Sequence, residues 1–162
     1  MEKVILGLGS NVGDKMTYLK NAVKALSLLL DNIVTSSVYQ TGAQEYTLQD
    51  DFLNMVVAGE YAGEPYTLLD KLQKIERENG RMRSSEVRKG PRTLDIDILF
   101  FGKRTVSTPV LTLPHPAIRN RAFVLVPLVE LLPGIKDLDG SLYKDLLPSL
   151  KGQKVEIIGR LE

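Results

Sequence analysis

The chain contains two aspartates inside a stretch that reads as a buried β-strand. This stretch is GPRTLDIDILFFG, residues 90–102, and it includes Asp95 and Asp97. Side chains two residues apart in a strand point to the same face, which puts the two Cβ atoms roughly 6–7 Å apart. Two like charges on one face repel each other, and aspartate is depleted in strands. A stable strand therefore needs another group that offsets the repulsion between the two carboxylates.

A divalent cation would offset that repulsion. Oxygen ligands at this spacing suit Mg²⁺, which binds one or two carboxylates and completes its coordination with phosphates and water. The alternative is an edge strand that carries inward charges against aggregation. That alternative predicts lysine or scattered charge rather than two carboxylates beside Arg92, so the pattern favours the metal.

Basic residues precede the aspartates. Glutamates at positions 76, 78 and 86 partly neutralise them, so a solvated charged face is one interpretation. Bidentate recognition of phosphate is the other, because arginine dominates and the run leads directly to the aspartates. The residues alone leave these two interpretations open. The run consists of Arg77, Arg81, Arg83, Arg88, Lys89 and Arg92.

His115 is the single histidine, and Pro114 and Pro116 flank it. A lone histidine is often structural, but Arg119 and Arg121 follow closely. Nearby positive charges disfavour the imidazolium and also mark an anion site. Contact with phosphate is therefore one hypothesis for this segment.

Phe52 and Phe123 each lie beside a polar stretch. Phenylalanine is commonly a core residue, and a stacking face for a flat ring is the alternative. The glycine-rich GLGSNVG, residues 7–13, has Val12 where a dinucleotide fingerprint needs its third glycine, and no P-loop sequence occurs in the chain. A tight turn with Ser10 or Asn11 capping the next helix is the favoured interpretation.

Composition excludes several classes of protein. The chain has 162 residues, a net charge of +1, no cysteine and one histidine. These values fit one domain over residues 1–162 and exclude disulfides and thiolate chemistry. They argue against a structural zinc site, and the charge shows no nucleic-acid signature. Without a signal peptide or a long apolar run, the expectation is a cytoplasmic protein with no membrane or nucleic-acid partner.

Hydrophobic periodicity predicts the elements that must position these residues. Helices are expected at 11–31, with Leu19 and Leu26 on the apolar face, at 64–80 between Pro65 and Gly80, and within 113–134. Residues 42–51 and 81–91 read as loops, and 102–107 as a hairpin turn with a partner strand. Strands are expected at 3–9, 32–41, 52–62, 93–101 and 155–159. The order β-α-β-β-α-β predicts a ferredoxin-like, mostly antiparallel sheet.

Taken together, the motifs resemble one enzyme family. In order and spacing, GLGSNVGD, FLN, GRMR, GPRTLDIDILFFG and LPHPAIRNRAFVLVPL are similar to 6-hydroxymethyl-7,8-dihydropterin pyrophosphokinase of folate biosynthesis, over about residues 4–132. The resemblance implies an α+β fold, with a mostly antiparallel sheet and helices on both faces. It also implies transfer of a pyrophosphoryl group from MgATP to the pterin hydroxymethyl group, with release of AMP.

The resemblance also implies roles for individual residues. Asp95 and Asp97 would hold two Mg²⁺ ions. Phosphate would be bound by Arg81, Arg83, Arg92, His115 and Arg121, of which all but Arg121 are expected to be catalytic. Gln73 and Glu76 would line the nucleotide site. Phe52 and Phe123 would sandwich the pterin, with Asn54 and the backbone of Thr41, Gly42 and Ala43 at its polar edge.

Two rival functions remain open at the level of the sequence. An RNA-binding module could share the sheet and the basic loop, although strand carboxylates would repel RNA phosphate and no aromatic RNP-like strand is present. A magnesium nucleotide-binding protein without transfer activity is the closer rival. The expected ligands are the small molecules ATP and a reduced pterin, and the expected assembly is a monomer.

Overall fold

The structure is a computed structural model that describes residues 1–41, 51–80 and 93–161. The remaining residues, 42–50, 81–92 and 162, lie outside the described part, and so do the expected loops that they make up. The strands are β1 (Glu2–Ser10), β2 (Asp31–Thr35), β3 (Val38–Thr41), β4 (Phe52–Tyr61), β5 (Asp95–Phe101), β6 (Val106–Ser107), β7 (Thr112–Leu113) and β8 (Val155–Gly159). The helices are α1 (Lys15–Leu29), α2 (Pro65–Glu78) and α3 (Ala122–Leu131), with shorter 3-10 helices η2 (Ile118–Asn120) and η3 (Tyr143–Leu150).

The main sheet has the strand order β5-β1-β4-β3-β8, and β2 also pairs with β4. Every strand pairing among the described residues is antiparallel. The long central strands β1 and β4 pair over their whole overlap. The first pair is Glu2 with Tyr61, and the last is Ser10 with Leu53. The expected ferredoxin-like, antiparallel sheet is therefore confirmed.

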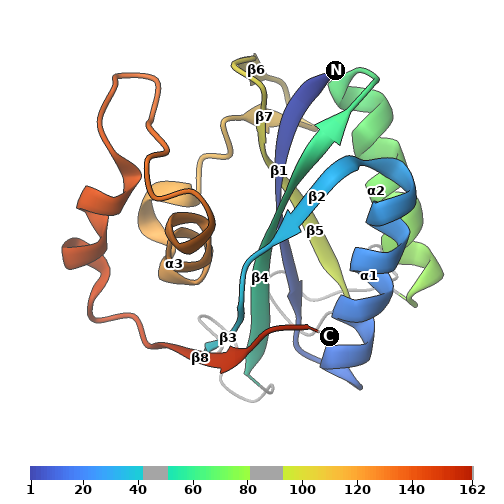
Figure 1. Ribbon diagram of the computed structural model, residues 1–162, viewed down its shortest axis with the longest axis horizontal. Coiled ribbons are helices and arrows are strands. Elements are labelled where there is room, and N and C mark those ends of the chain that lie inside the picture. Colours follow the sequence, from blue (N-terminus) through green and yellow to red (C-terminus); the bar gives the residue numbers. More distant parts are fainter. Residues whose placement is uncertain (42–50, 81–92, 162) are drawn as a thin grey trace.

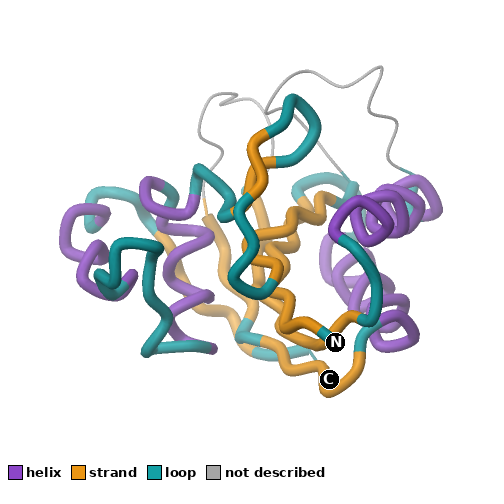
Figure 2. Tube along the Cα trace, turned by 90° about the horizontal axis from the view of Figure 1, so that it is seen from above, coloured by secondary structure: helices purple, strands orange, loops and turns teal. Residues whose placement is uncertain are grey.

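Helices cover both faces of this sheet, as expected. Figure 1 shows α1 and α2 on one side of the strands and α3 on the other, and Figure 2 shows the same layers from above. One core joins the sheet to Leu19 and Leu26 of α1 and Leu68 and Leu72 of α2. A second core joins the opposite face to α3, η2 and η3.

The start of α1 differs from the expectation. Asp14 is the N-cap and accepts the backbone N–H of Thr17, whereas Ser10 is the last residue of β1 and is fully buried with its neighbour Asn11. The turn before the helix uses Gly13, whose φ of +74° is the left-handed region that glycine tolerates best. Capping by Ser10 or Asn11 is therefore wrong, because Ser10 belongs to β1 and the helix begins only at Lys15, beyond the start that either cap would give.

The expected strand 32–41 is two strands, because a serine pair interrupts it. The Ser36 side chain accepts the backbone N–H of Val56 at 2.9 Å, where a strand would present a backbone carbonyl. Serine hydroxyls compete with ladder hydrogen bonds in this way. The pairing with β4 continues on both sides of the break, at Thr35 with Val57 and at Tyr39 with Asn54.

The expected hairpin after β5 also forms differently. β6 pairs with β7 in a separate two-stranded sheet rather than with β5. Gly102 turns the chain with a φ of +55°, and its N–H bonds the carbonyl of Lys3 on β1. The segment therefore leaves the sheet edge.

Among the described residues, no helix is long and apolar enough to cross a bilayer.

Candidate functional site

Two glycines of β1 form an open floor on the α3 side of the sheet. Gly9 pairs with Asp95 on β5 and with Asn54 on β4, and Gly7 pairs with Asp97. Residues paired across strands share a face, so the two carboxylates and the amide flank a strip without side chains. The first part of the glycine motif therefore lies in a strand between the chemical groups, as the expected strand 3–9 predicted, and the turn follows at Gly13.

A cavity opens over this floor, between the sheet and the beginning of α3. The space within it, with open solvent at its mouth included, is about 760 Å³. Its walls bring together residues from β4, β5, the 114–121 segment and α3 that the sequence singled out. These are Phe52, Asn54, Asp95, Asp97, His115, Arg121 and Phe123. Phe52 and Phe123, 71 positions apart in the chain, thus face one cavity. We call it the ring cavity because these two aromatic side chains line it.

A second cavity lies across β5, between α2 and the β6–β7 hairpin. The space within it is about 670 Å³ by the same measure, and Gln73 lies on its α2 wall. Pro109, Val110, Leu111 and Thr112 form the hairpin wall. Asp97 and His115 line this hairpin cavity as well as the ring cavity. The two cavities therefore meet at one carboxylate and one imidazole.

His115 is held as a neutral donor between these cavities. Its backbone N–H bonds the carbonyl of Leu99 at 2.9 Å, and its Nδ1 accepts the N–H of Ala117 at 3.1 Å. Burial and then the charge of Arg121 lower the pKa of His115, and Asp95 partly opposes them. The proton of the neutral ring is consequently on Nε2, because Nδ1 is an acceptor.

Asn54 is oriented by two neighbours. The Thr41 hydroxyl donates to its Oδ1 at 3.3 Å. A Cβ on Gly9 would lie 2.9 Å from its Nδ2, so the missing side chain of that glycine leaves room for the amide. A glycine inside a strand often marks such a close approach. Asn54 is buried and presents a fixed polar edge to the ring cavity.

Glu76 is placed differently from the other predicted site residues. It is 1% exposed on α2, and its Oε2 accepts the backbone N–H of Ile96 at 2.8 Å. Ile96 lies between the two aspartates of the edge strand β5. Glu76 lines neither the ring cavity nor the hairpin cavity, and it supports the backbone that carries the carboxylates.

The arginines near α3 separate into two groups. The Arg121 guanidinium lies 5.7 Å from the centre of the Phe123 ring, and both side chains line the ring cavity. Arg119 instead forms an ion pair with Asp137. The predicted residues Gly42, Ala43, Arg81, Arg83 and Arg92 lie outside the described residues.

The donor set fits Mg²⁺. Asp95 and Asp97 project from one face of β5 onto one cavity, and both offer carboxylate oxygens. No group of three or more histidine, cysteine, aspartate or glutamate residues gathers in a ligand cluster within residues 1–41, 51–80 and 93–161. Magnesium matches a pair of this kind, because it takes its remaining ligands from phosphates and water.

Two features of the site were not found by sequence reasoning. The first is the floor of β1, and its signal was present: Gly7 and Gly9 alternate with Leu6 and Leu8 in a strand pattern. The second is the hairpin wall, residues 109–112. That wall had no comparable signal, because β6 and β7 are two residues each.

The comparisons with known proteins span the residues that line both cavities. A family model described as 7,8-dihydro-6-hydroxymethylpterin-pyrophosphokinase matches residues 5–133. A 2-amino-4-hydroxy-6-hydroxymethyldihydropteridine pyrophosphokinase of Bacillus subtilis is 46% identical over 128 residues, which cover 78% of this chain and 75% of the relative. One with the same name from Methylorubrum extorquens is 40% identical and covers 96% of this chain and 98% of its own.

Solved structures show the same fold. The wild-type HPPK-DHPS of Plasmodium falciparum in complex with SDX-DHP superposes with a TM-score of 0.71 at 16% identity and covers 92% of this chain. The matched part is 43% of that longer chain, so the present chain spans less than half of it. This likeness therefore concerns the fold.

Proposed function

Because the chain belongs to the 7,8-dihydro-6-hydroxymethylpterin-pyrophosphokinase family, we propose that it transfers a pyrophosphoryl group from ATP to the hydroxymethyl group of 6-hydroxymethyl-7,8-dihydropterin and releases AMP. The observation that carries the proposal is the pair of cavities that meet at Asp97 and His115. A two-substrate transfer needs two binding sites whose reacting groups converge.

The ring cavity suits the pterin. Phe52 and Phe123 offer aromatic faces, and Asn54 offers a buried amide at the edge, with Thr41 beside it. A flat heterocycle is bound well by this combination of apolar walls and a few fixed polar groups. The backbone of Gly42 and Ala43 completes the polar edge in this proposal.

The hairpin cavity suits the nucleotide. Gln73 and the 109–112 wall would hold the base and sugar, with the phosphate chain running toward Asp97 and His115. Glu76 serves this site through β5, because its carboxylate binds the backbone of Ile96. Arg81, Arg83 and Arg92 complete the phosphate contacts in this proposal.

The reaction forms one bond and breaks one. The pterin hydroxyl oxygen attacks the β-phosphorus, the bond from that phosphorus to the α–β bridging oxygen breaks, and AMP leaves with the oxygen while the hydroxyl proton is released. Asp95 and Asp97 would hold two Mg²⁺ ions, which supply charge neutralisation along the phosphate chain. The Nε2–H of His115 and the Arg121 guanidinium would donate to phosphate oxygens on which charge develops.

Product analysis tests this proposal. Protein, ATP, Mg²⁺ and the reduced pterin are incubated, and phosphorus NMR with nucleotide chromatography identifies the products. Stoichiometric AMP and a pterin diphosphate are expected. ADP with a pterin monophosphate would show attack at the γ-phosphorus. If the pterin caused no consumption of ATP, the transfer reaction would be refuted and a nucleotide-binding protein without transfer activity would remain.

We also propose that the enzyme acts as a monomer in the cytoplasm. The proposed binding residues of both cavities all belong to one chain, which supports the proposal. Sedimentation velocity across a range of protein concentrations tests the assembly. A dimer whose dissociation abolishes activity would contradict it.

A further inference from the structure

The segment after η3 lies outside the part of the chain that the family model matches, residues 5–133. It holds Gln153, β8 and Leu161. We propose that Gln153 is a positioning residue that fixes Arg121 and Phe123 on the wall of the ring cavity. This inference rests on the proposed function for its catalytic consequence.

A single amide side chain brackets Arg121 on both sides. The Oε1 of Gln153 accepts the backbone N–H of Ala122 at 2.9 Å, and its Nε2 donates to the carbonyl of Asn120 at 2.9 Å. The two peptide groups that flank Arg121 are therefore held by one residue, 32 positions further along the chain. We call this pair of hydrogen bonds the bracket.

This bracket replaces an ordinary helix cap. Arg121 is the N-cap of α3, and its side chain makes no capping hydrogen bond. The first N–H groups of a helix lack partners within the helix, and a side chain of the N-cap residue commonly accepts one of them. Here Gln153 accepts the N–H of Ala122 instead. The guanidinium of Arg121 can then extend over the Phe123 ring toward the cavity.

The bracket is anchored to the opposite side of the same cavity. Two residues after Gln153, Val155 of β8 pairs with Thr41 of β3, whose hydroxyl donates to Asn54. The C-terminal segment thus connects the Arg121–Phe123 wall to the strand beside the polar edge. A shift of this segment would change the separation of the two walls that hold a flat ring.

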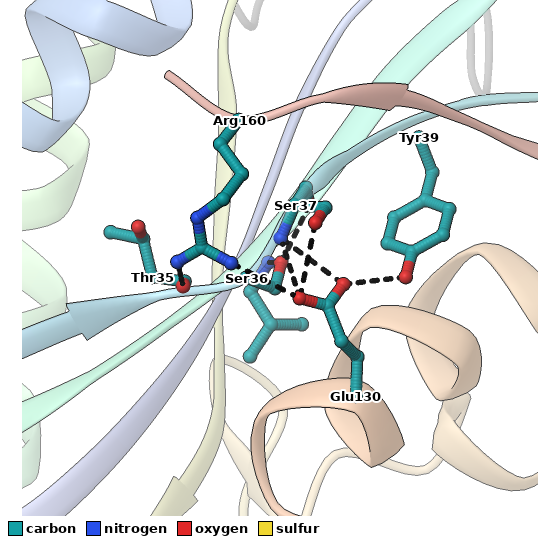
Figure 3. A network of polar contacts seen from close by, with 7 residues as sticks. Thr35, Ser36, Ser37, Tyr39, Glu130 and Arg160 are labelled. Atoms are coloured by element: carbon teal, nitrogen blue, oxygen red, sulfur yellow. Dashed lines mark hydrogen bonds and ion pairs between the residues drawn. The ribbon is translucent and has the colours of Figure 1, made fainter. Parts of the chain in front are cut away.

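The far end of the segment is held in place as well. Arg160 donates to the carbonyl of Thr35 at 2.7 Å and contacts Glu130 of α3 (Figure 3). Leu161 packs on the core between the sheet and the α1–α2 layer. Gln153 therefore extends from a fixed support, as a residue that orients others must.

Gln153→Leu tests the inference, because it keeps the size of the side chain and removes both hydrogen bonds. Lys151→Leu is the matched control, since it adds the same side chain at an exposed position two residues away. Calorimetry gives the dissociation constants for 6-hydroxymethyl-7,8-dihydropterin and for α,β-methylene-ATP with Mg²⁺. Melting curves confirm that each variant is folded at the temperature used, and Gln153→Ala replaces Gln153→Leu if that variant is not.

We expect Gln153→Leu to raise the pterin dissociation constant about three- to tenfold, the usual effect of losing one or two uncharged hydrogen bonds. The nucleotide analogue, held mainly in the hairpin cavity, should bind both variants equally. An unchanged pterin constant would overturn the inference. Equal weakening of both ligands would also overturn it, because that pattern indicates general loosening of the fold.

A ligand-free measurement separates this inference from the proposed function. If the wild-type protein bound no pterin, the proposed function would fail. The NMR signals of the Arg121 Nε–H and the Phe123 ring still report the positions of both side chains. They should move in Gln153→Leu and stay in place in Lys151→Leu, and signals unchanged in both variants would refute the positioning role.

Discussion

Asp97 is the residue at which the two cavities, the sheet edge and the candidate metal site coincide. It projects from β5 beside the floor formed by Gly7 and lines both cavities. Any cation held there would contact a phosphate chain that approaches from the hairpin cavity. The proposal therefore assigns Asp97 a larger effect on the reaction than any residue that lines one cavity.

Asp97→Asn should lower the rate of AMP formation by at least about 10- to 100-fold, because losing a metal ligand costs no less than losing a residue that supports one. The amide keeps the shape of the side chain and loses the charge. Asp70→Asn, on the exposed face of α2, is the control. Near wild-type activity of Asp97→Asn at saturating Mg²⁺ would contradict the metal assignment.

Gly9 matters for a different reason, namely the space that it leaves for Asn54. A methyl group there would lie 2.9 Å from the Asn54 amide nitrogen, a distance that real Cβ contacts essentially never show. Gly9→Ala should therefore displace the amide and raise the pterin dissociation constant about tenfold, as for a lost buried hydrogen bond.

A double-mutant cycle checks that the effect passes through Asn54. Asn54→Ala, Gly9→Ala and the double variant are compared by calorimetry with the pterin. In the Asn54→Ala background, Gly9→Ala should add little. If its effect remained at full size there, the glycine would act on something other than the amide.

At the scale of elements, Glu130 joins α3 to the break between β2 and β3. Its carboxylate accepts the N–H and hydroxyl of Ser37 and the hydroxyl of Tyr39, and Arg160 approaches it from the end of β8 (Figure 3). Burial alone would raise the pKa of Glu130. The hydrogen bonds from Tyr39 and Ser37 and the charge of Arg160 outweigh burial and lower it.

The stability of the protein should therefore depend on this carboxylate at acidic pH. A carboxyl group whose pKa is lowered by folding stabilises the folded state above its ordinary pKa, and the stabilisation is lost as pH falls through the folded value. For Glu130 the loss begins near the ordinary value of 4.5 and is complete below the lowered one. Glu130→Gln should flatten the pH dependence of the free energy of unfolding in that range.

Urea unfolding of wild type and Glu130→Gln between pH 3 and pH 7, about the range over which carboxylates titrate, measures this effect. Glu78→Gln, on the exposed side of α2, is the control and should keep the wild-type slope. Parallel curves for wild type and Glu130→Gln would show that the network does not contribute through the charge of Glu130.

At the scale of the whole molecule, the pterin and the nucleotide should be held by different walls, although their cavities meet at Asp97 and His115. Phe123→Ala should weaken the pterin, since a lost aromatic face costs about 0.5–1.5 kcal/mol beyond the buried area. Gln73→Ala should weaken the nucleotide analogue and leave the pterin unaffected. Calorimetry with each ligand alone gives the four constants. Equal losses of both ligands in Phe123→Ala would indicate a role in the core.

The sequence by itself determined the helices and strand faces that depend on local patterns of neighbouring residues. The apolar spacing of Leu19 and Leu26, and the Pro65 and Gly80 boundaries of α2, are local patterns, and the helices follow them. The alternation around Asp95 and Asp97 placed both on one face for the same reason. The residues alone made Phe52, His115, Arg121 and Phe123 candidates, each with an alternative role. The family resemblance favoured their binding roles and added Asn54, and all five line one cavity.

Only the tertiary structure decided what those residues meet. Strand register sets Gly7 and Gly9 between the aspartates and Asn54, and β5 makes Asp97 common to two cavities. Gln153 reaches Arg121 only because β8 returns to the edge of β3. Contacts of this kind join residues far apart in the chain. A local pattern states which face of its own element a residue occupies, and it contains no information about the partner that long-range packing places opposite.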